Sequence, residues 1–506
     1  MYLLGIDNGC TMAKAALFTT DGREVAVASR KSEMLDTQPG WAEFDMNQIW
    51  LNAAGAIRRV LDESGIDPKE VACVACTGHG NGLYLVDEAA QPVRNAIGSA
   101  DGRAREYIEQ WTADNVLDRI RPKTMQAIWP AQPNALLRWL ADHEPESIEK
   151  ARWVLMCKDF VRAQLTGEIA MELTDMSGTS LMDVGTGQYD DEVLEAFGLL
   201  GMKEMMPPLC KSADICGKVT AAAAEATGLA EGTPVAGGMF DIDACGLASG
   251  MVDEDALCMV GGTWGCNQYI ARKPVVSEDV FMTSCYSIDG YYLMLEGSAT
   301  SASNLEWFVT EFFQTERDLA EAEGRSVYDL CNELVAGTEP QDSGIVFLPF
   351  LYGSNVSLDG KACFFGLDGW QSRGHMLRAV YEGVIFSHKW HIDRLLNFRS
   401  MPATIRLTGG AARSEVWTQM FADIFQVPVE VPDGTELGAL GAAICGSVAA
   451  EIHPSYEAAC SAMVRYARTH EPNTDLAACY QAKYDRYKQM LDVMQPVWEK
   501  LVWKAP

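Results

Sequence analysis

The chain has 506 residues, a formal net charge of −30 and 48% hydrophobic residues. Its length exceeds the size at which one hydrophobic core keeps growing, so two domains are expected. The negative charge disfavours nucleic acid and anionic membrane surfaces as partners, and no apolar run reaches the roughly 18 residues of a membrane span. No signal peptide is expected ahead of the first strand. The 15 cysteines lack the spacing of a disulfide framework, which predicts reduced thiols and a cytoplasmic location.

The first 80 residues predict the order strand, strand, strand, helix, strand. Three strands are expected in succession: Tyr2–Asp7, Ala15–Thr20 and Glu24–Arg30. Asp45 predicts the N-cap of a helix that ends before Gly65, and Val71–Thr77 resumes the sheet. This order opens a ribonuclease-H-like or actin-like domain, and it can begin again at Leu257.

Further helices are expected along the rest of the chain. They are Asn134–His143, Lys158–Leu165, Thr220–Thr227, Leu437–Ala450 and a last helix from Leu476 to about Gln495. In the last helix, three tyrosines at Tyr480, Tyr484 and Tyr487 predict a packing stripe. Pro496 is expected to break or kink this helix, because proline lacks the backbone donor.

Two glycine-rich turns lie about 250 residues apart, in LLGIDNGCTMAKAALF (Leu3–Phe18) and in LCMVGGTWGCNQYIA (Leu257–Ala271). Glycine lets backbone N–H groups approach a ligand, and successive N–H groups form an anion nest. Two nests in equivalent places predict a duplicated domain that binds one polyphosphate from both sides, with Asp7 available for a metal. For either turn alone, an ordinary glycine hairpin is the alternative.

The segment GGMFDIDACGLASG carries two acidic residues, Asp241 and Asp243, at the end of an apolar run. In an extended strand they would share one face at a separation of about 7 Å, so only one would meet a given hydroxyl. Phosphoryl transfer to an alcohol needs a carboxylate that takes the hydroxyl proton and holds the oxygen in line. Either aspartate could be this base, and a capping role is the alternative.

The run ACFFGLDGWQSRGHMLRAVYEG, from Ala362 to Gly383, resembles the longer signature of the FGGY carbohydrate kinases. Further blocks follow in the family's order: PGWAEFDMNQIW, KDFVRAQLTGE, TDMSGTSLMD, TGLAEGTPV, FLPFLYGS and GGAARSEVWTQMFADIFQVPV. The resemblance spans Leu3 to about Tyr487. It implies an α/β fold of two ribonuclease-H-like (actin-like ATPase) domains with a cleft between them. Residues 1–248 would bind the sugar and carry the base, and residues 249–506 would bind the nucleotide.

The resemblance also implies a role for individual residues. Asp241 is the expected catalytic base, and Asp7 and Asp241 are the expected Mg²⁺ ligands. The expected sugar contacts are His79, Gly80, Asn81, Asp101, Arg103 and Asp241. The expected ATP contacts are Gly9, Cys10, Thr11, Lys14, Gly262, Thr263, Ala302, Glu306, Gly409, Gly410, Ala411 and Ser414.

Four departures from the family pattern bear on the substrate. Cys10 replaces the usual turn threonine, Ser99 stands where many members have tryptophan, and Leu136 replaces a lysine. After FLPFLYG, Ser354 and Asn355 stand where many members have glutamate and arginine. These departures resemble the L-xylulose kinase group, whose members also accept related keto sugars or keto acids. The expected activity is therefore ATP-dependent phosphorylation of a terminal hydroxyl of L-xylulose or a related pentulose or keto sugar acid.

Other acceptors stay open at this point, namely erythritol, D-xylulose, ribulose and glycerol. A non-catalytic, nucleotide-gated protein of the actin-like fold is the alternative from another class. Asp241 and the polar loop at 79–81 favour the kinase. A sugar-responsive regulator would need a DNA-binding module, and the chain has no basic appendage. The expected partners are the sugar and ATP, with a homodimer as the expected assembly.

Overall fold

The computed structural model describes residues 1–35, 37–354, 356–357 and 359–500, which form two compact units. Unit 1 comprises Met1–Asp253, Ile270–Met294 and Gly434–Arg465. Unit 2 comprises Glu254–Tyr269, Leu295–Asp433 and the chain from Tyr466 onward. The expected division after residue 248 stays a prediction. Within the described residues, no helix is both long and apolar enough to cross a membrane.

The sheet of unit 1 has the strand order β13-β14-β5-β1-β2-β3, with β15 also beside β5. Its strands are β1 (Tyr2–Asn8), β2 (Met12–Thr19), β3 (Glu24–Lys31), β5 (Val71–Gly78), β13 (Ile215–Lys218), β14 (Pro234–Ala236) and β15 (Met239–Phe240). The hairpin β1–β2 is antiparallel, whereas β5 runs parallel to β1. The four strands expected near the N-terminus are confirmed. The central strands β1 and β5 are nearly continuous apolar runs because helices cover both faces of the sheet.

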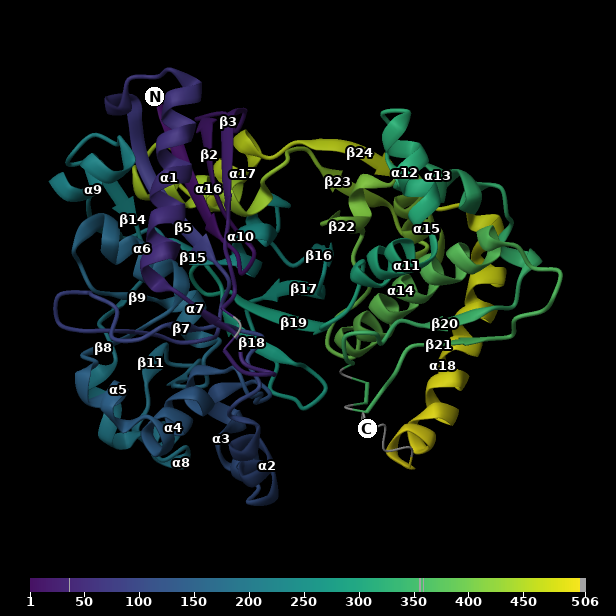
Figure 1. Cartoon of the computed structure of the whole chain (residues 1–506), viewed down its shortest axis with the longest axis horizontal. Coiled ribbons are helices and arrows are strands. Elements are labelled where there is room, and N and C mark those ends of the chain that lie inside the picture. Colours follow the sequence, from purple (N-terminus) through teal and green to yellow (C-terminus); the bar gives the residue numbers. More distant parts are fainter. Residues whose placement is uncertain (36, 355, 358, 501–506) are drawn as a thin grey trace. The chain divides into compact units, whose positions relative to one another are not determined.

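Helix α1 (Met46–Ser64) begins and ends where its capping residues predict. The Asp45 side chain accepts hydrogen bonds from the N–H groups of Asn47 and Gln48, and Gly65 has a φ of 65° in the left-handed region. The buried face of α1 packs against β2 and β3 (Figure 1).

Helix α16 (Leu437–Ala449) covers β1 and β5 from the other face of the sheet. It approaches so closely that a Cβ atom on Gly5 in β1 would lie 1.9 Å from the carbonyl oxygen of Ala439. Gly441 on α16 meets α10 (Asp241–Ala248) in the same way, since its Cβ would lie 2.1 Å from the carbonyl oxygen of Ala244. Because α16 is rich in glycine and alanine, it can approach β1 and α10 this closely. The expected packed helix is confirmed.

Smaller elements complete unit 1. Its other helices are α2 (Arg105–Ala113), α3 (Val116–Thr124), α4 (Pro133–His143), α5 (Pro145–Lys150), α6 (Cys157–Thr166), α7 (Leu173–Ser177), α8 (Asp191–Ala196), α9 (Ala221–Thr227) and α17 (Tyr456–Met463). Its short strand pairs are β4 (Glu43–Phe44) with β7 (Ala96–Ile97), β6 (Tyr84–Val86) with β8 (Trp153–Leu155), β9 (Met171–Glu172) with β12 (Leu209–Cys210), and β10 (Met182–Asp183) with β11 (Gln188–Tyr189).

The second large sheet repeats the order of the first. Its order is β18-β19-β17-β16-β22-β23-β24, with β16 (Ala256–Gly261), β17 (Gly265–Ala271), β18 (Met282–Cys285), β19 (Tyr292–Ser298), β22 (Thr404–Thr408), β23 (Val429–Pro432) and β24 (Tyr466–His470). The pairs β16–β17, β16–β22, β22–β23 and β23–β24 run antiparallel, parallel, parallel and antiparallel. The pairs β1–β2, β1–β5, β5–β14 and β14–β13 run in the same way. The prediction of a duplicated ribonuclease-H-like domain is confirmed.

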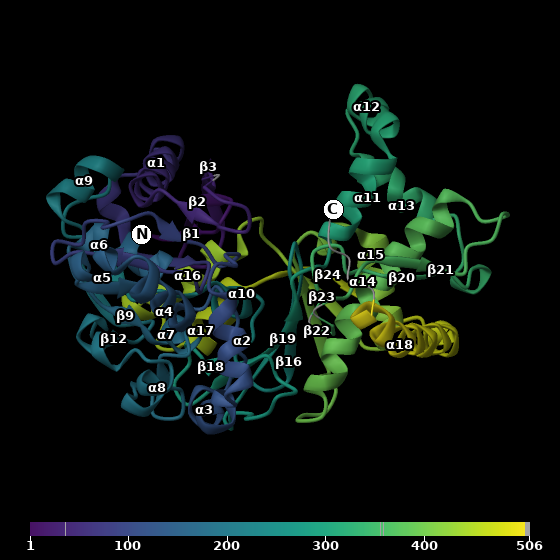
Figure 2. The same ribbon diagram turned by 60° about the horizontal axis from the view of Figure 1, so that its bottom comes forward.

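The helices and one hairpin of unit 2 complete its structure. They are α11 (Ser303–Phe312), α12 (Gln314–Ala322), α13 (Val327–Ala336), α14 (Arg373–Leu395), α15 (Glu415–Phe425) and α18 (Ala477–Lys500), with the hairpin β20 (Val346–Leu348) and β21 (Cys363–Phe365). Helices α11, α12 and α13 lie side by side (Figure 2).

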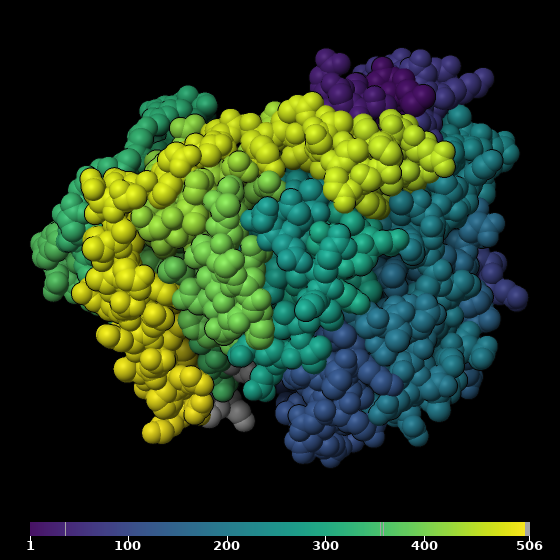
Figure 3. Space-filling model, turned by 180° about the vertical axis from the view of Figure 1, so that it is seen from behind, coloured from purple at the N-terminus to yellow at the C-terminus, as the bar shows by residue number. Residues whose placement is uncertain are grey.

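The last helix, α18, differs from the sequence-based expectation at one point. Its tyrosines at Tyr480, Tyr484 and Tyr487 are buried as predicted. The expected break at Pro496 is wrong, because the helix continues to Lys500 along the surface of unit 2 (Figure 3), whereas a kink at Pro496 stays a prediction. Two residues after the proline, Trp498 is buried with its ring 5.6 Å from that of Phe350. This packing offsets the backbone hydrogen bond that the proline removes.

Candidate active site

Three parallel strands of unit 1 bring the predicted acidic residues to one edge of the sheet. Strand β1 pairs with β5 so that Asp7 lies beside Thr77, and β15 pairs with β5 so that Phe240 lies beside Gly78. The segments that begin at Asp7, His79 and Asp241 therefore follow the carboxyl ends of adjacent strands. In open α/β sheets this edge is where ligands bind.

Both Asp241 and Asp7 have raised pKa values at this edge. Loss of hydration, together with the negative charge of Asp7, raises the pKa of the Asp241 carboxyl to about 8. Loss of hydration raises the pKa of Asp7 to about 6, although Lys14 opposes that shift. Gly438 on α16 leaves room for Asp7, because a Cβ there would lie 2.4 Å from its Oδ2 atom. Two carboxyl groups whose pKa values are raised by loss of hydration at one end of a sheet are typical of a functional site.

Asp243 has different surroundings, which the expected extended conformation did not predict. Strand β15 ends at Phe240, and both aspartates lie in the first turn of helix α10. Two residues of a helix differ by about 200° in direction, so the two side chains do not share a face. Asp243 is completely buried, and its Oδ1 accepts hydrogen bonds from the N–H and hydroxyl of Ser287 at 3.1 and 3.3 Å. It therefore holds the segment around Ser287, whereas Asp241 is partly exposed.

The first glycine-rich turn joins β1 to β2. It is closed by a hydrogen bond from Gly9 N–H to the carbonyl of Met12, and Cys10 Sγ lies 3.6 Å from Ser99 Oγ. Thr11 is exposed, and Lys14 forms an ion pair of 2.7 Å with Glu436. Burial alone would raise the pKa of the Cys10 thiol, but His79 and Ser99 lower it to about 7.

The expected sugar loop follows β5. The Nε2 atom of His79 lies 2.9 Å from the hydroxyl of Tyr84, and Asn81 is buried with a left-handed φ of 59° and an Oδ1 atom without a hydrogen-bond partner. Gly80 is required because its Cβ would lie 2.2 Å from the ring of Phe240. This loop therefore packs directly against the residue before Asp241.

Asp101 and Arg103, the other expected sugar contacts, bind each other. Arg103 Nε lies 2.9 Å from Asp101 Oδ1, and Arg103 Nη2 lies 2.9 Å from a Glu43 carboxylate oxygen. The guanidinium also stacks 3.8 Å over the ring of Trp41. Only Nη1 of Arg103 lacks a hydrogen-bond partner. This arrangement supports the wall of the site, and direct sugar contact by these two residues stays a prediction.

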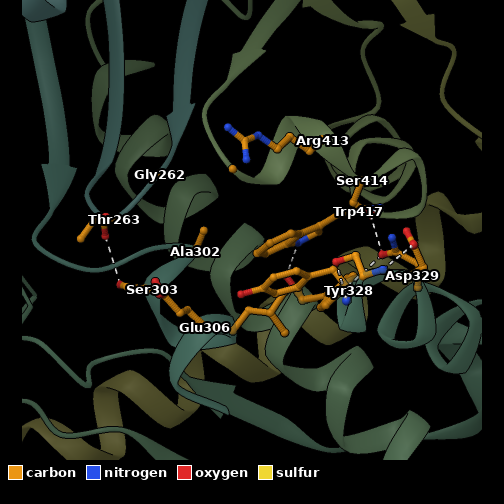
Figure 4. Close-up of a pocket in the computed structure, with 15 residues that line it drawn as sticks. Gly262, Thr263, Ala302, Ser303, Glu306, Tyr328, Asp329, Arg413, Ser414 and Trp417 are labelled. Atoms are coloured by element: carbon orange, nitrogen blue, oxygen red, sulfur yellow. Dashed lines mark hydrogen bonds between the residues drawn. The ribbon is translucent and has the colours of Figure 1, made fainter. Parts of the chain in front are cut away.

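Unit 2 contains a pocket of about 600 Å³, within the range of small-ligand sites. Six expected nucleotide residues line it: Gly262, Thr263, Ala302, Glu306, Gly410 and Ser414. Figure 4 shows the turn at Gly262 and Thr263 on one side of the pocket and Ser414 and Trp417 on the other. Gly409 and Ala411 lie next to Gly261 instead, outside the pocket lining. The four expected nucleotide residues of the first turn belong to unit 1.

Sequence reasoning missed nine residues of the pocket lining. They are Ser303, Leu305, Ser326, Tyr328, Asp329, Asn332, Tyr381, Arg413 and Trp417. Asn332 Oδ1 accepts hydrogen bonds from Ser414 Oγ at 2.7 Å and from the Tyr381 hydroxyl at 3.0 Å, and the ring of Tyr381 stacks on Trp417. Helix α13, which carries Asn332, has the pattern of an ordinary amphipathic helix with a capping box at Ser326, so its sequence gave no signal of a binding role.

Two family models match this chain. Residues 2–247 match the N-terminal domain of the FGGY family of carbohydrate kinases, and residues 257–450 match its C-terminal domain. The chain belongs to this family of carbohydrate kinases. FGGY kinases transfer a phosphoryl group from ATP to an alcohol group of a sugar, so the chain is a phosphotransferase.

Similar proteins agree with this FGGY assignment. The chain is 36% identical to the L-xylulose/3-keto-L-gulonate kinase of Escherichia coli, over 98% of this chain and 97% of that protein. It is also 36% identical to a probable L-xylulose kinase of Pasteurella multocida, over 98% and 99% of the two chains. Among solved structures, the xylulose kinase from Rhodospirillum rubrum is similar with a TM-score of 0.88 and 25% identity, over 99% of this chain and all of that one.

A substitution in the first turn of this FGGY kinase tests whether Cys10 contacts a phosphate group. Cys10→Thr adds a hydroxyl that can donate to a phosphate oxygen, so we expect unchanged kcat and an equal or lower KM for ATP, by up to about fivefold for a hydrogen bond of roughly 1 kcal/mol. Steady-state kinetics at saturating sugar measure this. A loss of folded protein on thermal unfolding would instead identify Cys10 as a packing residue of the turn.

Proposed function

We propose that this FGGY kinase phosphorylates a terminal hydroxyl of L-xylulose or of a closely related pentulose or keto sugar acid. The observation that carries the proposal is the meeting of Asp7, the 79–81 loop and Asp241 at the carboxyl ends of adjacent strands. The names of the two kinases that are 36% identical over nearly the whole chain support this choice of acceptor.

We propose Asp241 as the general base. In this role its carboxylate accepts the proton of the sugar hydroxyl and holds the oxygen in line with the γ-phosphoryl group. A base with a raised pKa is a stronger proton acceptor, although with a pKa of about 8 only the minor, deprotonated fraction of Asp241 can act as the base at neutral pH. His79 and Asn81 would hold the sugar hydroxyls, because both side chains lie on the loop next to Phe240.

Mg²⁺ is proposed to accompany ATP beside Asp7 and Asp241. Both proposed ligands are carboxylates, whose oxygen atoms suit Mg²⁺. In the described part of the chain, no group of three or more acidic, histidine or cysteine side chains could hold a metal ion by itself. Mg²⁺ bound with a nucleotide usually takes one or two carboxylates, and its other ligands are phosphate oxygens and water. When bound, the ion would neutralise phosphate charge during transfer.

The pocket of unit 2 is proposed to bind the adenosine of ATP. The paired aromatic rings of Trp417 and Tyr381 and the fixed amide of Asn332 supply an apolar wall with a few directed polar groups. Such walls are common in nucleoside sites. The glycine turn at Gly262 and Thr263 would place backbone N–H groups near the phosphates.

A panel of acceptors tests the proposed substrate. The purified enzyme with ATP and Mg²⁺ is assayed for ADP release with L-xylulose, 3-keto-L-gulonate, D-xylulose, L-ribulose, erythritol and glycerol. We expect the highest kcat/KM for L-xylulose or for 3-keto-L-gulonate. A higher kcat/KM for erythritol or glycerol would show that the acceptor is a polyol and would reject the ketose assignment.

The compartment and the assembly are proposals as well. The spacing of the 15 cysteines, which lacks the pattern of a disulfide framework, supports the expected cytoplasmic location. The homodimer stays a prediction, and the native mass of the purified protein measures it.

A further inference from the structure

A buried hydrogen-bond network lies directly behind Asp241. Its central residue is Thr174, which is 1% exposed and belongs to the short helix α7. The Thr174 Oγ1 atom accepts a hydrogen bond of 3.0 Å from the backbone N–H of Phe240, the residue before Asp241. The same hydroxyl donates its proton to Glu172 Oε2 at 2.7 Å. Thr174 therefore connects the peptide that carries the candidate base to a buried carboxylate.

The partner of Thr174 is itself fixed from several sides. Glu172 is fully buried and is the N-cap of α7, accepting from the N–H of Thr174 at 3.0 Å. The same oxygen, Oε1, also accepts from the hydroxyl of Ser212 at 2.7 Å, and Lys158 Nζ lies 3.4 Å from Oε2. The hydrogen bonds to the Glu172 side chain come from the N–H groups of Thr174 and Asp175 and from the hydroxyls of Thr174 and Ser212. The hydroxyl of Thr174 must then donate to Glu172 and accept from Phe240, which gives the network one direction.

The N-cap residue of helix α10 does not cap the helix with its own side chain. Phe240 is its N-cap, and no side-chain hydrogen bond caps this helix. The backbone before Asp241 is held by the short parallel pairing of β15 with β5, which covers only two residues, and by the hydrogen bond to Thr174. Two paired residues leave a strand end free to shift, whereas the additional buried hydrogen bond fixes its position.

We propose that Thr174, oriented by Glu172, is a positioning residue that fixes the peptide before Asp241 and so aims the carboxylate at the sugar hydroxyl. The proposal rests on the proposed function, in which Asp241 is the base. In-line transfer is sensitive to the placement of the base, and a displacement of about 1 Å can cost about 100-fold in rate. Thr174 touches neither substrate nor nucleotide in this role, so it acts only through Asp241.

The test compares three substitutions at one position. Thr174→Val keeps the shape but removes both hydrogen bonds, and we expect kcat to fall about 10- to 100-fold with the KM values for sugar and ATP within about threefold of the unchanged enzyme. Thr174→Ser keeps the hydroxyl and should retain kcat within about threefold. Thr174→Cys keeps only a weak hydrogen-bond acceptor, so its kcat should lie between those of the serine and valine variants. The cysteine variant replaces the valine variant in this comparison if the valine variant does not fold.

Thr179→Val is the matched control. Thr179 is also fully buried near the end of α7, but its hydroxyl donates to the Met176 carbonyl of the same segment and does not reach Phe240. We expect it to lower thermal stability as Thr174→Val does, with kcat near that of the unchanged enzyme. An unchanged kcat in Thr174→Val, or equal losses in the serine and valine variants, would overturn the positioning role.

Asp241→Asn, measured in the same series, separates this proposal from the one on which it rests. If Asp241→Asn is inactive while Thr174→Val retains full kcat, Asp241 is the base and the positioning role of Thr174 is wrong. If Asp241→Asn retains activity, the assignment of the base itself fails, and any loss in Thr174→Val then has another cause, so the positioning role is rejected with it.

Discussion

Replacing Asp241 by asparagine is expected to lower kcat by roughly two to four orders of magnitude, the usual effect of losing a general base. The amide keeps the shape of the side chain but cannot accept the hydroxyl proton. ATP binding should persist, because the pocket residues of unit 2 are unchanged. Initial-rate kinetics and nucleotide binding by calorimetry measure the two effects.

Asp243→Asn is the matched control for Asp241→Asn. Its Oδ1 atom already accepts two hydrogen bonds from Ser287, which an amide oxygen can also accept, so we expect a smaller loss of kcat. If Asp243→Asn abolished turnover and Asp241→Asn did not, the base would be Asp243.

Asp241→Asn should also change the pH dependence of stability. The folded-state pKa of Asp241 is about 8, above the ordinary value of 3.8. Between these two values the folded protein holds a proton that the unfolded chain releases, so the free energy of unfolding falls as the pH rises from about 4 to about 8. Asparagine does not titrate. We therefore compare the melting temperatures of the variant and the unchanged protein without Mg²⁺ or ligands. The melting temperature of the variant minus that of the unchanged protein should increase as the pH rises toward 8. A constant difference between pH 4 and pH 8 would contradict the raised pKa.

Gly5→Ala is expected to have the largest effect on stability. The new Cβ would lie 1.9 Å from the carbonyl oxygen of Ala439, a backbone atom of α16 that cannot rotate away. Strand β1 or helix α16 would have to move, and overpacking of this kind costs about 3 kcal/mol or more. At about 2–4 °C for each kcal/mol, the melting temperature should fall by roughly 10 °C.

Gly201→Ala is the matched control for Gly5→Ala. A Cβ atom at Gly201 would meet no atom within 4 Å, and its φ is not in the left-handed region. Thermal unfolding of both variants measures the difference. Equal melting temperatures would show that α16 is not seated against β1 as the structure describes.

Local signals predicted the elements that depend on a few neighbouring residues. The helix from Asp45 to Gly65 has a capping side chain at one end and a left-handed glycine at the other, and both act within one turn. The conformation at Asp241 and Asp243 depends instead on where β15 stops pairing with β5, which is a contact between distant parts of the chain. The course of α18 beyond Pro496 likewise depends on the burial of Trp498.

The same distinction holds for the candidate site. Glycine turns and an acidic motif are visible in the sequence because their chemistry is concentrated in a few adjacent residues. Thr174, Asn332 and Tyr381 are single polar positions on helices, and only the folded chain shows that Thr174 meets Phe240 and that Asn332 meets Ser414. These partners of Thr174 and Asn332 are 66 and 82 residues away in sequence.

The late position of α16 in the sequence has a consequence for the folding of unit 1 during synthesis. Unit 1 begins with Met1 but needs Gly434–Arg465 to cover the inner strands of its sheet. At typical translation rates of about 5–20 residues per second, the ribosome needs roughly 10–40 s to make the chain between Asp253 and α16. Throughout that interval β1 and β5 expose an apolar face on the nascent chain. The part of unit 1 that is made first therefore completes its folding only after α16 has been made, and chaperones would protect it in the meantime.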